Sequence, residues 1–436
     1  MRAEYVALVG MGTVGTGVAR LLLEQGDRLS RHAGCRLVLK YIVDPDVARP
    51  RSLQVPDGLL TPDLGRVLND PEVRVVVQLI GGLEPERSIM LQLLERGKDI
   101  VTANKALLAE YGPELFDRAR QLGRCIAFDA SVGGGIPIIT NICQCLSANQ
   151  ILSISGILNG TTNFIISQME ERGSDYAAAL AEAQRRGFAE QDPTLDVDGT
   201  DAAQKLAILA HLAFGAHVRW NHIPRVGIDK LDPADLRYAR ELGYRVKLLA
   251  IAQLVDGGLE LHVSPTLVRM GQPLAEVRGA NNAISVIGDA VGRVFYQGLG
   301  AGQMPTASAA VADLIDTVVG RAQITFRTLQ LWSNRAPRVG LAQHAAGKGR
   351  FYFRFMVEDH PGVLAEITGV LGRQAISIAS VIQHEPEVEA SEGEEPVVPL
   401  VIMTHTATEG AAEEAVREIN RRDFIRQASV RMRVSD

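Results

Sequence analysis

The sequence predicts an α/β protein in three parts: a doubly wound parallel-sheet domain over residues 1–135, a mixed α+β domain over 136–335, and a ferredoxin-like module over 350–436. Three observations lead to this prediction. A glycine-rich turn follows the first strand-like run, buried β-branched runs recur after it, and the last part alternates in the order βαββαβ. The length of 436 residues, with 46% hydrophobic and 22% charged residues, is typical of a globular protein with several domains.

The first element is a short buried strand over residues 5–10 that runs into the turn Gly10-Met11-Gly12-Thr13-Val14-Gly15 and then a helix. This order is the Rossmann fingerprint, in which glycines let the backbone approach a pyrophosphate lying on the helix N-terminus. A purely structural glycine turn is the alternative, but the flanking strand and helix favour dinucleotide binding. The predicted cofactor-binding residues here are Gly10, Gly12, Thr13, Val14 and Gly15.

The second strand, residues 37–43, ends at Asp44, whose carboxylate can accept a hydrogen bond from the ribose 2′-hydroxyl of NAD. Arg49 and Arg51 follow closely and could neutralise the 2′-phosphate of NADP. The choice between NAD and NADP therefore stays open.

Later strands bring more residues to the same sheet edge. Residues 73–80 form a continuous apolar run that predicts a buried parallel strand. The strand 99–102 leads into Ala103-Asn104-Lys105, which places Lys105 at the carboxyl end of its strand, beside the expected nicotinamide. The alternative is that Lys105 is an ordinary surface lysine without a chemical role. A last strand, 124–128, leads into a loop with three glycines that could be only a hinge.

The mixed domain is predicted to hold strands at 151–158 and 260–268 and helices at 164–171 and 240–254. A glycine-rich segment, 298–308, precedes an alanine-rich helix that ends near residue 319; no Lys-Ser/Thr pair follows the glycines, which excludes a P-loop. Residues 336–348 are interpreted as a flexible linker, and the acidic residues 385–395 as a mobile hairpin tip.

The stretch 183–205 combines a proline- and glycine-broken loop, rich in carboxylates, with the start of an apolar helix. Helix capping by a solvated acidic loop is one interpretation. A calcium loop is excluded, because alignment on Gly199 puts Thr194 first and Lys205 last, where acids are required. A site for a zwitterionic small molecule is the third interpretation, and Asp201 and Lys205 would share one helix face because they are four residues apart.

The spacing of this stretch resembles the signature of homoserine dehydrogenases: Ala183-x3-Gly187-Phe188-Ala189-x2-Asp192-Pro193-x2-Asp196-Val197-x-Gly199-x-Asp201-x3-Lys205. The resemblance spans nearly the whole chain. It implies an NAD(P)-dependent oxidoreductase that interconverts L-aspartate 4-semialdehyde and L-homoserine, in the biosynthesis of threonine, methionine and isoleucine.

The resemblance also implies roles for single residues. Lys205 would donate the proton, Lys105 would assist across the cleft, and Asp201 would orient Lys205. The implied substrate-binding residues are Glu190, Asp196, Asp201 and Lys205. The implied cofactor-binding residues outside the glycine turn are Asp44, Arg49, Lys105, Gly187 and Gly302. A monovalent cation such as Na⁺ would be held by Asp129 and by the loop at Val132, Gly134 and Ile136.

The segment Asp359-His360-Pro361-Gly362-Val363-Leu364, together with the βαββαβ order, resembles an ACT domain. An ACT domain implies an amino-acid effector, which in this pathway would be L-threonine. Every residue with a predicted chemical role lies before Gln303, and the module has its own strand order, so residues from about 350 onward are predicted to regulate and not to catalyse. Truncation after Leu341 is therefore predicted to leave an active enzyme that ignores threonine. The family also implies a homodimer or homotetramer.

The composition of the chain argues against nucleic acid, a membrane and a zinc ion as partners. A net charge of −6 without a long basic run argues against nucleic acid. No apolar run reaches the ~20 residues of a membrane-spanning helix, and the N-terminus has no signal-peptide pattern, so a cytoplasmic protein is expected. Four cysteines suit a reducing compartment, and Cys143-x-Cys145 lacks the second pair that a zinc site needs.

Two competing functions are a catalytically silent sensor of NAD(P) and amino acids, and a dehydrogenase of another amino-acid semialdehyde. The sensor hypothesis predicts the loss of catalytic positions, whereas Lys105, Glu190, Asp201 and Lys205 are all present. Measuring activity with a panel of amino-acid semialdehydes distinguishes the second hypothesis from a homoserine dehydrogenase.

Overall fold

The computed structural model describes residues 2–329, 331–332, 336–384 and 396–435. The chain divides into two compact units, and each takes residues from more than one of the three predicted segments. The first unit comprises 1–160, 200–223 and 280–339; the second comprises 161–199, 224–279 and 340–436.

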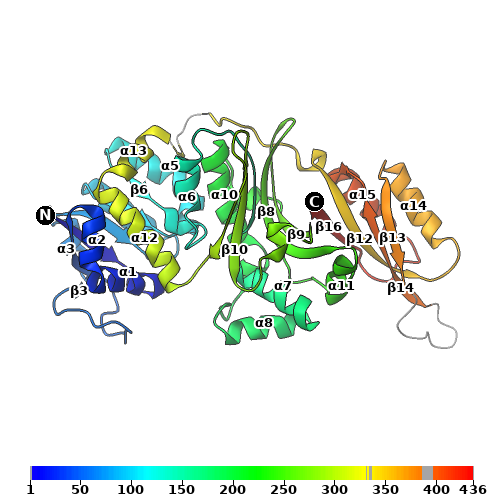
Figure 1. Ribbon diagram of the computed structural model, residues 1–436, viewed down its shortest axis with the longest axis horizontal. Helices are drawn as coiled ribbons and strands as arrows, with labels where there is room; N and C mark the ends of the chain where they lie inside the picture. The colour runs from blue at the N-terminus through cyan, green and yellow to red at the C-terminus, as the bar shows by residue number, and fades with distance from the viewer. Residues whose placement is uncertain (1, 330, 333–335, 385–395, 436) are drawn as a thin grey trace. The chain divides into compact units, whose positions relative to one another are not determined.

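The first unit is organised around a six-stranded parallel sheet (Figure 1). Its order, β3-β2-β1-β4-β5-β6, is the doubly wound order of dinucleotide-binding domains, which confirms the predicted Rossmann fold. The strands are β1 (Ala3–Val9), β2 (Arg36–Val43), β3 (Leu60–Thr61), β4 (Val73–Gln78), β5 (Asp99–Thr102) and β6 (Ile126–Ala127).

Helices α1 (Thr13–Glu24), α2 (Gly26–Ala33), α3 (Gly65–Leu68), α4 (Glu86–Glu95) and α5 (Lys105–Gln121) connect these strands. The alanine-rich helix α12 (Gln303–Val318) returns from far along the chain to join their core. A Cβ on Gly17 of α1 would lie 2.8 Å from the Ala307 Cβ, so the two helices pack closely only because both residues are small. Helix α13 (Arg321–Leu329) follows α12.

The remainder of the first unit holds an antiparallel ladder and the helix that carries Lys205. The ladder has the order β11-β10-β7, from β11 (Gly292–Leu299), β10 (Asn281–Gly288) and β7 (Ile151–Ile157). Helix α10 (Thr200–Phe214) packs against α5. The short turns are η1 (Asp129–Ser131), α6 (Ile138–Thr140), the π-helical η2 (Asn141–Cys145) and η3 (Trp220–His222).

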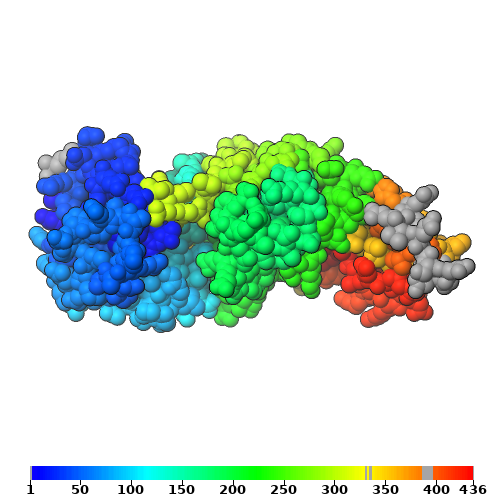
Figure 2. Space-filling model, turned by 90° about the horizontal axis from the view of Figure 1, so that it is seen from below, coloured from blue at the N-terminus to red at the C-terminus, as the bar shows by residue number. Residues whose placement is uncertain are grey.

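The second unit begins with α7 (Gly160–Arg172), α8 (Tyr176–Arg185) and α9 (Thr194–Val197). Helix α8 buries only Ala179 and Ala183, and its outer surface faces the viewer in green in Figure 2. Helix α11 (Pro233–Glu241) then precedes the long hairpin β8 (Tyr244–Val255) and β9 (Gly258–Arg269), and η4 (Pro273–Glu276) follows.

The helix predicted over residues 240–254 is wrong, because the chain is helical only to Glu241 and extended from Tyr244. Gly243 adopts φ +86°, a left-handed conformation that ends α11. The apolar run after it is buried in β8 and pairs residue by residue with β9. A continuous apolar run of this kind does not by itself distinguish a buried strand from a buried helix.

The C-terminal module confirms the ferredoxin-like prediction. Its elements are β12 (Lys348–Glu358), α14 (Val363–Arg373), β13 (Ile378–Gln383), β14 (Val397–Thr404), α15 (Glu409–Ile419) and β16 (Val430–Ser435), with the two-residue β15 (Ala407–Thr408) before α15. The strand order is β16-β12-β14-β13, and residues of both helices share one apolar core with β12 and β14. The predicted hairpin tip at 385–395 lies outside the described residues.

The module is not a separate body attached by a loose linker. Strand β16 pairs in parallel with β9, where Arg433 lies opposite Thr266. The predicted flexible linker, residues 336–348, is also hydrogen-bonded to β9. The Leu259 amide donates to the Gly340 carbonyl oxygen at 2.8 Å, and the Leu259 carbonyl oxygen accepts from the Ala342 amide at 3.0 Å. The short helix η5 (His344–Ala346) then leads into β12.

Candidate functional site

The glycine turn between β1 and α1 leaves space at one position and forbids side chains at the two others. A Cβ on Gly15 would lie 2.0 Å from the Gly10 carbonyl oxygen, and one on Gly10, at φ +96°, would lie 2.9 Å from the Leu79 carbonyl oxygen. A Cβ on Gly12 would meet no atom within 4 Å, so this side remains open to an approaching group. No side chain caps α1, which leaves the first-turn amides of Thr13 and Val14 for an anion. The turn therefore fits a pyrophosphate.

Asp44 lies beside this turn and ties it to β2. Its Oδ2 accepts from the Met11 amide at 2.8 Å, and its Oδ1 accepts from Asp46 and lies 3.3 Å from the Arg51 guanidinium. Arg51 also donates to three backbone carbonyls of its own loop and is nearly buried, whereas Arg49 is exposed. Of the two arginines considered for a 2′-phosphate, only Arg49 presents its side chain to solvent.

Three of the predicted catalytic residues come together around the Asp201 carboxylate. Its Oδ2 lies 2.7 Å from Lys205 Nζ, and its Oδ1 lies 3.0 Å from Lys105 Nζ. Lys105 begins α5 directly after β5, while Asp201 and Lys205 lie one turn apart in α10. Asn104 fixes the start of α5, because its Oδ1 accepts from the Leu107 amide and its Nδ2 donates to Ile80 and Gly82.

The electrostatics of this cluster keep the acid charged. Asp201 is only 5% exposed, and burial alone would raise the pKa of its carboxyl. The two neighbouring ammonium groups and a hydrogen bond from Asn159 outweigh burial and hold that pKa well below its usual value. Asp201 is therefore an ionised bridge between a buried lysine, Lys205, and a half-exposed one, Lys105.

Residues without an individually predicted role complete the cluster, and one of them, Asn159, lies in the turn 159–163 that the resemblance implies along the substrate cleft. Asn159 Nδ2 donates to Asp201 Oδ2 at 2.9 Å. Lys205 Nζ donates to the Leu158 carbonyl oxygen at 2.7 Å, and Asn282 Nδ2 donates to the same oxygen at 3.0 Å. The only sequence signal was the polar segment 159–163 after the strand β7. The identity of its partner depends on a contact across 42 positions of the chain.

The other predicted residues are distributed over both units. Gly302, at φ +120°, precedes α12 in the first unit, and no side chain caps that helix. Gly187, Glu190 and Asp196 belong to the second unit, where Glu190 is exposed after α8 and Asp196 is half-buried in α9. The structure thus brings together Lys105, Asp201 and Lys205, all within the first unit.

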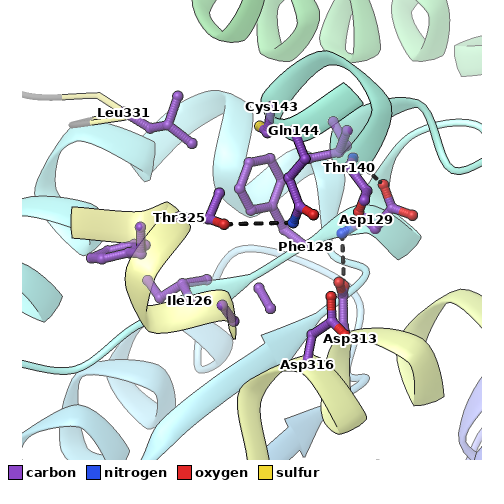
Figure 3. Close-up of a pocket in the computed structure, with 14 residues that line it drawn as sticks. Ile126, Phe128, Asp129, Thr140, Cys143, Gln144, Asp313, Asp316, Thr325 and Leu331 are labelled. Atoms are coloured by element: carbon purple, nitrogen blue, oxygen red, sulfur yellow. Dashed lines mark hydrogen bonds between the residues drawn. The ribbon is translucent and has the colours of Figure 1, made fainter. Parts of the chain in front are cut away.

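Figure 3 shows the surroundings of Asp129, one of the four predicted cation ligands. Asp129 lines a cavity of about 50 Å³ with Asp313 and Asp316, and Val132, Gly134 and Ile136 are not among its lining residues. The Asp129 carboxylate accepts from the Thr140 amide at 3.0 Å, and its own amide donates to Asp313 at 2.7 Å. Burial raises the pKa of Asp129 to about 6 and that of Asp313 well above its usual value. These oxygen donors suit a hard cation chemically, but the carboxylate is oriented toward the start of α6.

The glycine turn forms a pyrophosphate site at the carboxyl edge of a doubly wound sheet, and the same unit holds an acid and two ammonium groups. Together these features define the class of nicotinamide-dependent dehydrogenases. The ammonium groups supply the positive charge and the protons that conversion of a carbonyl into an alcohol requires.

Comparison with known proteins identifies the family. Residues 10–129 match the family "Homoserine dehydrogenase, NAD binding domain", residues 137–315 match "Homoserine dehydrogenase", and residues 351–424 match "ACT domain". The homoserine dehydrogenase of Pseudomonas aeruginosa is 40% identical, covering 100% of this chain and 99% of that protein.

Solved structures agree. A homoserine dehydrogenase from Thiobacillus denitrificans has a TM-score of 0.90 at 39% identity, covering 100% of this chain and 99% of that one. A hyperthermophilic archaeal homoserine dehydrogenase mutant, solved with NADPH, shares the fold at a TM-score of 0.61 and 24% identity, covering 73% of this chain and 98% of that one. The chain belongs to the homoserine dehydrogenase family, and it is an NAD(P)-dependent oxidoreductase. No helix among the described residues is long and apolar enough to span a bilayer.

Proposed function

We propose that the chain reduces L-aspartate 4-semialdehyde to L-homoserine, reversibly, in the biosynthesis of threonine, methionine and isoleucine. The observation that carries this proposal is the single ionised carboxylate, Asp201, held between Lys105 and Lys205. A carbonyl oxygen placed beside this pair would meet positive charge and a proton donor at the point where alkoxide charge develops.

The bound nicotinamide supplies the hydride, and the protein residues handle the proton and the substrate charges. Lys205 Nζ protonates the forming alkoxide, Lys105 stabilises it, and Asp201 positions both ammonium groups. Asp201 stays ionised throughout, because its pKa is lowered. Glu190 and Asp196 hold the polar end of the substrate, and Gly187 and Gly302 adjoin the cofactor; these four assignments rest on the family resemblance.

The direct test is a steady-state assay with L-aspartate 4-semialdehyde and each reduced cofactor, beside a panel of other amino-acid semialdehydes. We expect the four-carbon semialdehyde to give the highest kcat/KM. A higher value for another semialdehyde would reassign the substrate. A folded protein that binds NADPH and turns over none of them would favour the silent sensor.

We further propose that both nicotinamides are used and that Arg49 favours NADPH. Arg49→Ala should weaken NADPH binding roughly tenfold or more, since a charge-assisted phosphate contact is lost, and should leave NADH binding nearly unchanged. Titration of intrinsic fluorescence with each cofactor measures both constants. Equal losses for NADH and NADPH would remove Arg49 from the phosphate site.

Arg51→Ala is the matched control for this experiment. The Arg51 guanidinium is occupied by Asp44 and by carbonyls of its own loop, so its removal should loosen the Asp44 loop and weaken both cofactors alike. This expectation replaces the one from the sequence, in which both arginines served the phosphate.

Other family properties belong to the same proposal: a homodimer or homotetramer, an L-threonine effector, a cytoplasmic location, and Na⁺ bound by Asp129, Val132, Gly134 and Ile136. Activity in Na⁺ compared with a large organic cation at equal ionic strength tests the cation site.

A further inference from the structure

Lys205 makes two hydrogen bonds within the first unit, and together they fix the direction of its remaining N–H. Its Nζ donates to the Asp201 carboxylate and to the Leu158 carbonyl oxygen, each at 2.7 Å. An ammonium group has three N–H donors in a tetrahedral arrangement. Once two of them are held, the group cannot rotate, and the third N–H keeps one direction. The residues that hold the two acceptors therefore decide whether this proton reaches a substrate oxygen.

Both acceptors are held from one point in the chain, directly after β7. The Leu158 carbonyl oxygen is one acceptor itself, and Asn159 Nδ2 donates to the other, Asp201 Oδ2, at 2.9 Å. Strand β7 ends immediately before this point, at Ile157, which lies opposite Ala283 of β10. The antiparallel ladder thus sets the place of both acceptors.

Asn282 of β10, the neighbour of Ala283 in the chain, holds the Leu158 carbonyl in turn. Its Nδ2 donates to that oxygen at 3.0 Å, so the two lone pairs of the carbonyl serve Lys205 and Asn282. Two donors on one carbonyl restrict its orientation as well as its distance. The Asn282 side chain is itself confined, because it is 1% exposed and a Cβ on Gly300 would lie 1.9 Å from its Nδ2.

The oxygen of the same amide is unfavourable for stability. Asn282 Oδ1 is buried and has no hydrogen-bond partner in the part of the chain that the structure describes. Buried polar groups are nearly always hydrogen-bonded, and one without a partner lowers stability. An apolar side chain of the same shape would avoid this loss, since the Leu158 oxygen would still accept from Lys205. A local feature that opposes stability beside a reactive cluster indicates a functional role.

A purely structural asparagine is the competing interpretation, and Asn149, beside the same ladder, shows what one looks like. Its Oδ1 accepts from the Val291 amide at 2.8 Å, and its Nδ2 donates to the Leu146 carbonyl oxygen at 3.3 Å. Both ends of that amide tie down a turn. Asn282 instead uses one end of its amide, and the acceptor it holds is an acceptor of Lys205.

We propose that Asn282 is a positioning residue of the reaction. Through the Leu158 carbonyl it fixes the direction of the third N–H of Lys205, and thereby the rate at which the proton is transferred. The proposal rests on the proposed function, in which Lys205 is the proton donor. It gives Asn282 no contact with substrate or cofactor, so a change at this position should act on kcat and not on KM.

The test is steady-state kinetics of Asn282→Leu in the full-length protein, which keeps the shape of the side chain and removes both polar atoms. We expect kcat to fall roughly tenfold or more, because a small misplacement of a reacting group can cost up to about 10²-fold. KM, cofactor affinity and the unfolding temperature should not be impaired. Wild-type kcat in this variant, or a loss confined to KM or cofactor binding, would overturn the proposal.

A double-mutant cycle with Lys205→Ala tests whether Asn282 acts through Lys205. If it does, adding Asn282→Leu to Lys205→Ala should lower the residual rate no further. Independent losses that multiply would overturn the proposal and leave the reaction itself intact. A wild-type protein that fails to reduce the semialdehyde would refute the proposed function instead, so the two failures are distinguishable.

Asn149→Leu is the matched control, because it removes an asparagine with two hydrogen bonds outside the Lys205 cluster. It should lower the unfolding temperature and leave kcat unchanged, the reverse of the pattern expected for Asn282→Leu. The same pattern in both variants would assign Asn282 a structural role. Should Asn282→Leu fail to fold, Asn282→Ala gives the same readouts with less bulk, and failure of both to fold would also make Asn282 a structural residue.

Discussion

Replacing Lys205 by alanine is expected to lower turnover by at least ~10² and to leave cofactor affinity nearly unchanged, because a positioned proton donor contributes about that factor. The variant should fold, since Lys105 stays 3.0 Å from Asp201 and keeps that buried carboxylate paired. The measurement combines initial rates with a cofactor titration on the same preparation.

Lys230→Ala, at an exposed lysine, is the control and should behave like the wild type. Near-normal turnover in a folded Lys205→Ala protein would remove Lys205 from the mechanism. A parallel loss in Lys105→Ala, with a larger increase in KM, would agree with a lysine that touches the substrate without donating the proton.

Removing the C-terminal module is expected to unfold the second unit, which reverses the expectation from the sequence. Asp235 of α11 is completely buried, and its partners come from β12: Arg354 at 2.6 and 2.9 Å, and the Tyr352 hydroxyl at 2.8 Å. Truncation after Leu341 would remove all of these partners together and would also strip β16 from β9. Because a typical domain is stabilised by only roughly 5–15 kcal/mol, the loss of both sets of contacts is expected to unfold the unit.

Arg354→Met in the full-length chain isolates the ionic part of this effect. We expect a loss of about 3–5 kcal/mol in the free energy of unfolding, measured by chemical denaturation, and a smaller loss in the double variant Asp235→Leu/Arg354→Met, where no charge is left unpaired. Arg373→Met removes an exposed ion pair with Glu418 and should change stability by less than about 1 kcal/mol. A truncated protein that folds and keeps full activity would refute the structural role.

Features that depend on short spacing could be predicted from the sequence. The glycine turn is one case, since backbone geometry alone requires small residues at Gly10 and Gly15. The pairing of Asp201 with Lys205 is another, because four residues make one helical turn. The βαββαβ order followed from alternating patterns that the module's own core enforces.

Features that depend on contacts between distant segments could not be predicted. Nothing local marks Asn159 as the partner of Asp201, Arg354 as the partner of Asp235, or β16 as the neighbour of β9. The misassigned segment at 244–254 is extended because β9 pairs with it, and such tertiary pairing overrides local preference. The linker was expected to be loose for the same reason: its contacts with Leu259 are not visible in its composition.

The pairing of β16 with β9 also affects how the protein is made. The ribosome releases β8 and β9 long before β16, so Thr266, Leu267 and Val268 of β9 lack their partner strand throughout synthesis of the module. Strand edges of this kind promote association between nascent chains, and closure over such a long sequence separation is slow. Cells producing this protein rapidly should therefore need chaperone capacity during the interval before the last strand emerges, and substitutions that weaken β16 should reduce soluble yield before they reduce specific activity.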